Sequence, residues 1–178
     1  MGRDKTRLRL DGKTLLQNVQ AIAGHIPWST RIIRRDAVPR CGPLGGIVTA
    51  LTSTRAEAIL FLACDMPFVP ADWLECVIGE LMPKTQAVFT YIDRRAGFPF
   101  VLRTSVLPIV ERHIVEKRFS LQALAEDCGA KRIAPPTRIK KMFLNINTPE
   151  DWQSALQLEK KFQAGLSSKA KSDTFPAC

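Results

Sequence analysis

The sequence lacks the features of a membrane protein and of a disulfide-rich or zinc-binding protein. No hydrophobic run approaches the roughly 18 residues that would span a bilayer, and no apolar segment follows the first charged residues. The five cysteines are scattered, without a CxxC pair or a Cys/His cluster. We therefore expect a cytoplasmic protein with neither a disulfide framework nor a zinc knuckle.

Acidic residues are few relative to basic ones. The chain carries 26 Lys and Arg against 17 Asp and Glu, a formal net charge of +9. The basic residues are spread along the chain, and no RRM motif or Gly-rich KH loop accompanies them. The sequence therefore predicts no nucleic-acid partner, and the charge is left to indicate an acidic membrane surface, small polyanions or only a solvated surface.

The length of 178 residues is that of one domain, and apolar spacing alternates between strand and helix patterns. Helices are predicted at 13–25, 43–54, from Pro70, at 105–116, 121–128 and 149–162, and strands at 32–33, 58–64, 87–92, 98–102 and 142–146. This alternation predicts an α/β fold, a mostly parallel sheet with helices on both faces. The domain should cover residues 1–164, with residues 165–178, rich in Ser and Lys, as a mobile tail.

Asp65 ends the continuous apolar run Ala58–Cys64. Such a run is typical of a strand buried on both faces of a parallel sheet, and ligands bind at the carboxyl ends of these strands. A carboxylate at that point either meets a cation or caps the next turn before a proline. Position alone does not separate these two interpretations.

Four short motifs occur in an order that resembles one family. They are Met1–Lys5, Gly42–Gly46, Cys64–Pro67 and Asn145–Asp151. Together they resemble the MobA family, the molybdenum cofactor guanylyltransferases. The resemblance implies a Rossmann-like nucleotidyltransferase that joins GMP from GTP to molybdopterin, uses Mg²⁺ and releases pyrophosphate. It also makes Mo-enzymes and other cofactor-biosynthesis proteins candidate partners.

The resemblance assigns catalytic roles to Lys5 and Asp65. Asp65 would hold Mg²⁺, which prefers carboxylate and phosphate oxygens, and Lys5 would contact the triphosphate. Gly2 lies in the same phosphate-side motif. Outside the motif, Lys5 would be interpreted only as a solvated lysine near a terminus.

The nucleotide base is expected beside Gly42, Gly45 and Gly46, since glycines let a base approach the backbone closely. Asp36 corresponds to a family aspartate that recognises guanine, because a carboxylate can accept from both N1 and the exocyclic amine. Alternatively, the glycines mark only a turn, and Asp36 is a surface residue among arginines.

The acceptor side is expected to include Arg118, Asn145 and Asn147, which match a helix-start arginine and an Asn-x-Asn pair of the family. The alternatives are a solvated arginine and turn asparagines. His25 and His113, the latter expected on a charged helix face, are assigned no chemistry.

The chain departs from the family pattern at its beginning, because the family's first strand and most of its glycine-rich phosphate loop precede the motif at Met1. One hypothesis is that the native enzyme is longer than this chain. A second is a degenerate member that binds a partner or pterin without catalysis. A third is a related enzyme that transfers CMP from CTP to the same cofactor.

Overall fold

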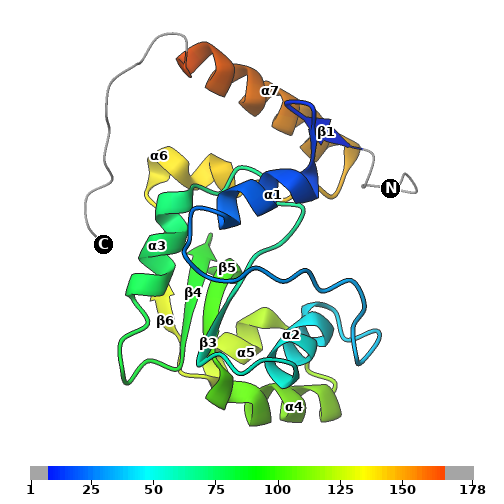
Figure 1. The fold of residues 1–178 in the computed structure, drawn as a ribbon, viewed down its shortest axis with the longest axis vertical. Helices are drawn as coiled ribbons and strands as arrows, with labels where there is room; N and C mark the ends of the chain where they lie inside the picture. Colours follow the sequence, from blue (N-terminus) through cyan, green and yellow to red (C-terminus); the bar gives the residue numbers. More distant parts are fainter. Residues whose placement is uncertain (1–7, 167–178) are drawn as a thin grey trace.

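The computed structural model describes residues 8–166, in which helices cover both faces of a four-stranded sheet (Figure 1). The elements, with 3-10 helices labelled η, are β1 (Arg9–Leu10), β2 (Lys13–Thr14), α1 (Leu15–Ala23), α2 (Pro43–Thr52), β3 (Ala58–Phe61), α3 (Ala71–Gly79), β4 (Ala87–Ile92), β5 (Arg95–Arg103), η2 (Thr104–Val106), α4 (Leu107–Val115), α5 (Leu121–Asp127), β6 (Lys131–Ile133), α6 (Thr137–Lys140), η3 (Lys141–Phe143) and α7 (Pro149–Leu166). No helix within this range is both long and apolar enough to cross a bilayer.

The main sheet has the strand order β3-β5-β4-β6. Strand β5 is antiparallel to both of its neighbours, and β4 is parallel to β6, so β3, β4 and β6 share one direction. The hairpin between β4 and β5 turns at Asp93 and Arg94, whose φ angles of 49° and 66° suit a tight turn between twisted strands. The predicted α/β class with helices on both faces of the sheet is confirmed, although only one of the three ladders among the described strands, β4–β6, is parallel.

Each face of the sheet has its own hydrophobic core. Phe89 and Phe100 are fully buried, stack with ring centroids 4.4 Å apart and pack with α2, α4 and α5. Val88 and Val101 point the other way and pack with Trp73 of α3 and with α6 and η3. The alternation of side chains along a strand thus supplies both layers.

The predicted helices are all present, and their ends follow local capping chemistry. The Thr14 hydroxyl accepts from the Gln17 N–H, and the Gln17 side chain accepts from the Thr14 N–H, which forms a capping box for α1. Pro43 occupies the first turn of α2, and the Ser120 hydroxyl caps α5. Helix α7 runs through Leu166, and the rest of the predicted tail lies outside the described residues.

Two predicted strands are wrong. Ile32 and Ile33 form no strand, since no described segment pairs with them. Residues 142–146 contain the end of η3 and an irregular segment instead of a strand. The fourth strand is β6, which the sequence does not signal because two of its three residues, Lys131 and Arg132, are charged and exposed. It forms through parallel pairing with β4.

The burial predicted for β3 is also wrong. Its residues are only half-buried, because β3 is an edge strand that pairs with β5 alone among residues 8–166. Thr104 N–H donates to the Glu57 carbonyl on the β5 side. The N–H and C=O groups of successive residues in a strand point to opposite edges. Because those of Glu57 face β5, those of Ala58 and Leu60 face the open edge of β3.

Candidate functional site

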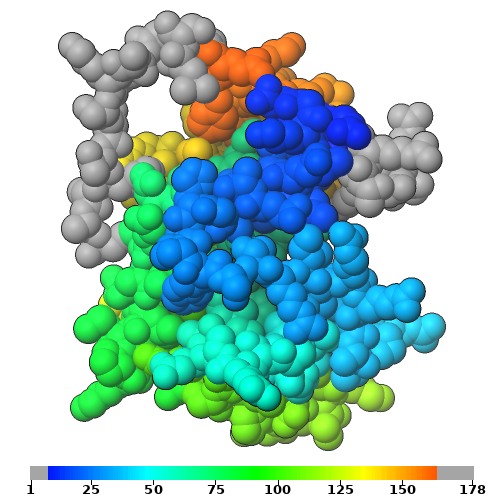
Figure 2. Space-filling model, in the orientation of Figure 1, coloured from blue at the N-terminus to red at the C-terminus, as the bar shows by residue number. Residues whose placement is uncertain are grey.

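A cavity of about 1070 Å³ lies along the open edge of β3. Its walls come from α1, the segment 28–33, the start of α2, and residues 56–65. Figure 2 views the molecule in the same orientation, with residues 25–40 in blue crossing the face above α2 in cyan. We call the cavity along the edge of β3 the β3 cavity. Its lining includes five predicted site residues: Asp36, Gly42, Gly46, Asp65 and Asn145.

Asp65 is half-buried just beyond the carboxyl end of β3. Its main-chain carbonyl accepts a hydrogen bond of 2.9 Å from the Ile146 N–H. Ile146 is itself fully buried in a small core with Leu10, Leu15 and Ala155. This contact between distant parts of the chain brings Asn145 to the same cavity as Asp65.

Asn147 does not line the β3 cavity. Its main-chain N–H and that of Thr148 donate to the Asp151 carboxylate, at 2.9 and 2.8 Å, while Asp151 N–H donates to the Thr148 hydroxyl. These bonds close the first turn of α7, where a carboxylate suits the free N–H groups. The backbone of Asn147 thus belongs to a helix start.

Within residues 8–166, no group of three or more His, Cys, Asp and Glu side chains is placed to hold a metal ion. Mg²⁺ does not require such a group, because it commonly binds one or two carboxylates and completes its shell with phosphate oxygens and waters. Asp65, a carboxylate at the border of a cavity large enough for a nucleotide, fits that mode of binding.

Asp36 is held over the glycines of α2. The Ala37 N–H donates to the Thr49 hydroxyl at 2.8 Å, and this hydroxyl donates to the Gly45 carbonyl at 2.6 Å. A Cβ at Gly45 would lie 2.7 Å from Asp36 Oδ2 and 2.7 Å from the Val38 carbonyl oxygen, whereas one at Gly46 would lie 3.6 Å from Asp36 Oδ1. Gly45 therefore lies beneath Asp36, and the positive N-terminal end of α2 faces its carboxylate.

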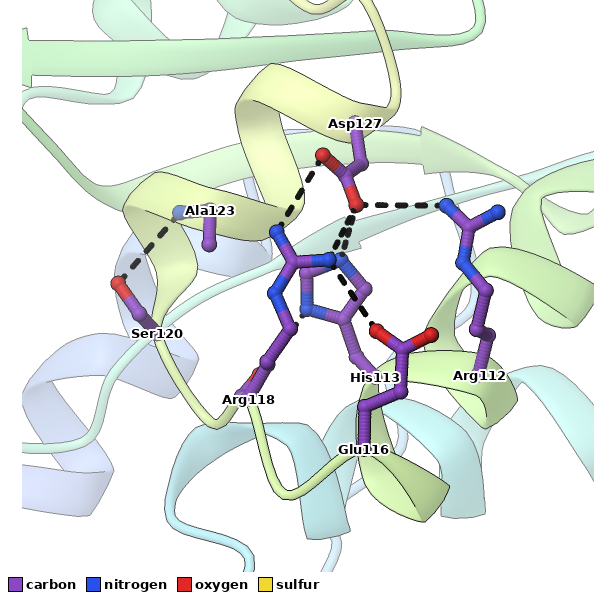
Figure 3. Close-up of polar contacts among 7 residues, drawn as sticks. All are labelled: Arg112, His113, Glu116, Arg118, Ser120, Ala123 and Asp127. Atoms are coloured by element: carbon purple, nitrogen blue, oxygen red, sulfur yellow. Dashed lines mark hydrogen bonds and ion pairs between the residues drawn. The ribbon is translucent and has the colours of Figure 1, made fainter.

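Arg118 belongs to a polar cluster at the α4–α5 turn, shown in Figure 3. Its guanidinium donates from Nη1 to Asp127 Oδ2 at 2.9 Å and to Glu116 Oε2 at 3.3 Å. Arg112 and His113 also contact Asp127 Oδ2, at 3.3 and 2.9 Å. We call these five residues the Asp127 cluster. Arg118 does not line the β3 cavity.

The electrostatics of the Asp127 cluster follow from these bonds. Hydrogen bonds from Arg118 and then His113 lower the pKa of Asp127, and the same contact with Asp127 raises the pKa of Arg118. Burial raises the pKa of the neighbouring Cys128 thiol to about 11, so this cysteine is neutral at physiological pH.

The structure adds residues that the sequence did not reveal. His113, expected on a charged helix face, is fully buried. The Thr49 hydroxyl links the Asp36 loop to α2, and the Asp127 carboxylate contacts Arg112, His113 and Arg118. The neighbouring sequence does not predict the role of any of these three residues, because each makes a hydrogen bond to a residue in another element or loop. Gly2 and Lys5 lie outside the described residues.

Residues 1–132 match the family described as the MobA-like NTP transferase domain. A probable molybdenum cofactor guanylyltransferase of Carboxydothermus hydrogenoformans is 27% identical over 71% of this chain and 66% of that protein. The corresponding protein of Opitutus terrae is 30% identical over 85% of this chain and 86% of its own. The match spans only 61–66% of the length of three such relatives.

Solved structures share the fold. Molybdopterin-guanine dinucleotide biosynthesis protein A from Archaeoglobus fulgidus superposes with a TM-score of 0.68 at 22% identity, over 90% of this chain and 92% of that one. The 2-C-methyl-D-erythritol 4-phosphate cytidylyltransferase from Thermus thermophilus gives a TM-score of 0.65 at 14% identity, over 88% and 93%. At these identities the likeness establishes the fold alone, which is that of Rossmann-like nucleotidyltransferases.

The two neighbouring glycines of α2 should respond oppositely to substitution by alanine. Gly45→Ala would displace Asp36 and the Val38 main chain, since a Cβ would lie 2.7 Å from each. Gly46→Ala makes an ordinary contact at 3.6 Å and gains helix propensity of up to about 1 kcal/mol. Urea unfolding should show Gly45→Ala destabilised and Gly46→Ala unchanged or stabilised. Equal destabilisation would contradict the proposed packing.

Asp127 should stabilise the fold in a pH-dependent manner. Because its pKa is lowered in the folded protein, its contribution is complete above the unfolded pKa of about 3.9 and is lost as the pH falls through the folded value. The difference in Tm between the wild type and Asp127→Asn should therefore be largest above about pH 5 and should shrink on acidification. Glu126→Gln, which removes a carboxylate outside the cluster, is the control. A difference independent of pH would refute the role.

Proposed function

The chain belongs to the family of MobA-like NTP transferase domains, and we propose that it transfers GMP from GTP to molybdopterin during molybdenum cofactor biosynthesis. The observation that carries the proposal is the β3 cavity, whose lining includes Asp36, Gly42, Gly46, Asp65 and Asn145. Several relatives are named molybdenum cofactor guanylyltransferase. The reaction asks a protein mainly for positioning and electrostatic stabilisation, so no protein nucleophile is needed.

Guanine selection is assigned to Asp36, which is exposed over the start of α2. Its carboxylate could accept hydrogen bonds from N1–H and the exocyclic amine of guanine. Cytosine lacks a proton at the corresponding ring nitrogen, so it cannot make the same pair of bonds. Gly42 and Gly46 leave room for the base at the cavity wall.

Asp65 would hold Mg²⁺ in the bound state, and the ion would neutralise charge that develops on the phosphate oxygens. Lys5 and Gly2 are proposed to serve the triphosphate. Asn145, which borders the cavity, and Asn147 are proposed for the acceptor side. Arg118 stays a proposal for that side as well, and its guanidinium would have to share its donors with Asp127 and Glu116.

One observation favours a second candidate, a member that binds nucleotide or pterin without catalysis. The open edge of β3 has no strand partner among residues 8–166. Transfer depends on N–H donors preorganised around the phosphates, and removing even one such donor costs about 10²–10³ in rate, whereas binding is less sensitive to their loss.

The choice of nucleotide and the role of the metal can be tested together. The chain is incubated with molybdopterin, Mg²⁺ and either GTP or CTP, and pyrophosphate release is followed. We expect transfer from GTP in preference to CTP. Asp65→Asn should lower the rate by roughly 10² or more, since several kcal/mol of stabilisation are lost.

Variants of two aspartates separate base recognition from general electrostatics. Asp36→Asn should weaken GTP binding roughly 10-fold or more and leave CTP binding unchanged, since a hydrogen bond to a charged group contributes about 1.5–3 kcal/mol. Asp72→Asn, an exposed aspartate in the first turn of α3, is the matched control. A preference for CTP would support the cytidylyl alternative, and binding without any transfer would support the non-catalytic one.

We further propose that a strand not contained in residues 8–166 pairs with the open edge of β3 in the active enzyme. Residues 56–65 line the β3 cavity along the length of a strand. Ile32 and Ile33, where a strand was predicted, also line the cavity. A strand between them and β3 would satisfy the backbone groups of Ala58 and Leu60.

This proposal predicts the effect of an added N-terminal extension. A strand-forming segment followed by a glycine-rich loop, fused before Met1, should raise both Tm and the transfer rate. The same extension with proline at the centre of its strand is the control, because proline removes a ladder donor. Equal behaviour of the two extensions would sink the proposal.

A further inference from the structure

We propose that His113 is a positioning residue of the nucleotide site: as a doubly protonated ring, it holds the α4–α5 turn against the glycine-rich segment 42–46. The inference rests on the proposed function for its effect on nucleotide binding. The structural part of the proposal, a charged ring with two hydrogen bonds, rests on contacts in the Asp127 cluster (Figure 3). We call the two contacts of the ring, with the Arg118 carbonyl and with Asp127, the His113 latch.

Both ring nitrogens of His113 face oxygen acceptors. Nδ1 lies 3.0 Å from the Arg118 carbonyl oxygen, and Nε2 lies 2.9 Å from Asp127 Oδ2. A carbonyl cannot donate, and the Asp127 carboxylate already accepts from Arg112 and Arg118. A neutral ring has only one N–H, so one of these short contacts would oppose two lone pairs. Only the imidazolium donates to both.

The surroundings of His113 can accommodate this charge. The ring is fully buried, and a buried charge is tolerated only when it is paired and hydrogen-bonded. The charged residues of α4 and the turn are Glu111, Arg112, Glu116, Lys117 and Arg118, and those of α5 are Glu126 and Asp127. Helix α2, which also packs on α4, has no titratable side chain, and the Cys128 thiol beside Asp127 is neutral.

The contact between the His113 ring and the Arg118 carbonyl fixes the backbone of the turn. The Arg118 N–H donates to the His113 carbonyl at 2.8 Å, while its own carbonyl accepts from the His113 ring at 3.0 Å. His113 thus contacts both main-chain groups of Arg118, the N–H through its own carbonyl and the carbonyl through its ring. Lys117, with φ of 56°, makes the reversal that this geometry needs.

The latched turn lies against the glycine-rich segment. The Phe119 carbonyl oxygen lies 3.9 Å from the position of a Cβ on Gly42, the residue before α2 that borders the β3 cavity. The Phe119 side chain packs in the core cluster that contains Cys41 and Leu44. A turn released from His113 would therefore withdraw support from the backbone that is proposed to receive the base.

Two substitutions distinguish the contact of the ring with the Arg118 carbonyl from its contact with Asp127. The amide of His113→Asn reaches the position of Nδ1 and can still donate to the Arg118 carbonyl, whereas that of His113→Gln reaches the position of Nε2 and keeps only the Asp127 contact. Both should lower Tm. We expect GTP affinity within about threefold of wild type for His113→Asn and at least fivefold weaker for His113→Gln. Equal or reversed affinities would overturn the positioning role.

The protonation of the ring is measured directly and does not depend on GTP. In the wild-type chain with ¹⁵N-labelled histidine, both His113 nitrogens should show imidazolium shifts at neutral pH, and His113→Asn identifies the signals. A neutral tautomer would overturn the proposal. If the wild type binds no GTP, the proposed function fails, whereas amide exchange at Gly42 and Phe119 still tests the latch. Faster exchange in His113→Gln than in His113→Asn is expected, and equal exchange would count against it.

Discussion

The hydrogen-bond ladders on both edges of β5 are the interaction on which the rest of the structure depends. This strand is antiparallel to β3 on one side and to β4 on the other, so it sets the relative direction and register of all three strands. Its side chains also enter both cores, Phe100 on one face and Val101 on the other. The carboxyl end of β3, and with it Asp65, is placed by this pairing.

The site is assembled by main-chain contacts more than by side-chain packing. The Ile146 N–H bonds to the Asp65 carbonyl and brings the Asn145 segment to the cavity. The Thr49 hydroxyl links Ala37 to Gly45 and places Asp36 over the α2 glycines. Backbone groups held in this way cost little entropy to position, which suits a reaction that depends on orientation and charge placement.

The positive charges of the chain have different uses that composition cannot separate. Arg112 and Arg118 converge on Asp127, which the His113 ring also contacts, and these contacts hold two helices and their turn together. Lys131 and Lys140 pair with Glu80 and Asp93, respectively. An excess of basic residues therefore does not by itself mark a polyanion-binding surface. Position relative to the β3 cavity is the better guide to ligand contacts.

The sequence by itself determined the helices, the hairpin strands and the order of the motifs, because these depend on local spacing, capping and turn chemistry. Local spacing drew attention to Asp65 because it ends an apolar run, whereas the roles predicted for Asp65 and for the glycines at α2 came from the resemblance to the family. Only the tertiary structure decided that β3 is an open edge, that Ile32 and Ile33 remain unpaired, and that β6 forms. It also decided that His113 is buried between Asp127 and the Arg118 carbonyl. The reason is physical: strand pairing and burial of a polar ring depend on partners distant in the sequence, which local periodicity does not reveal.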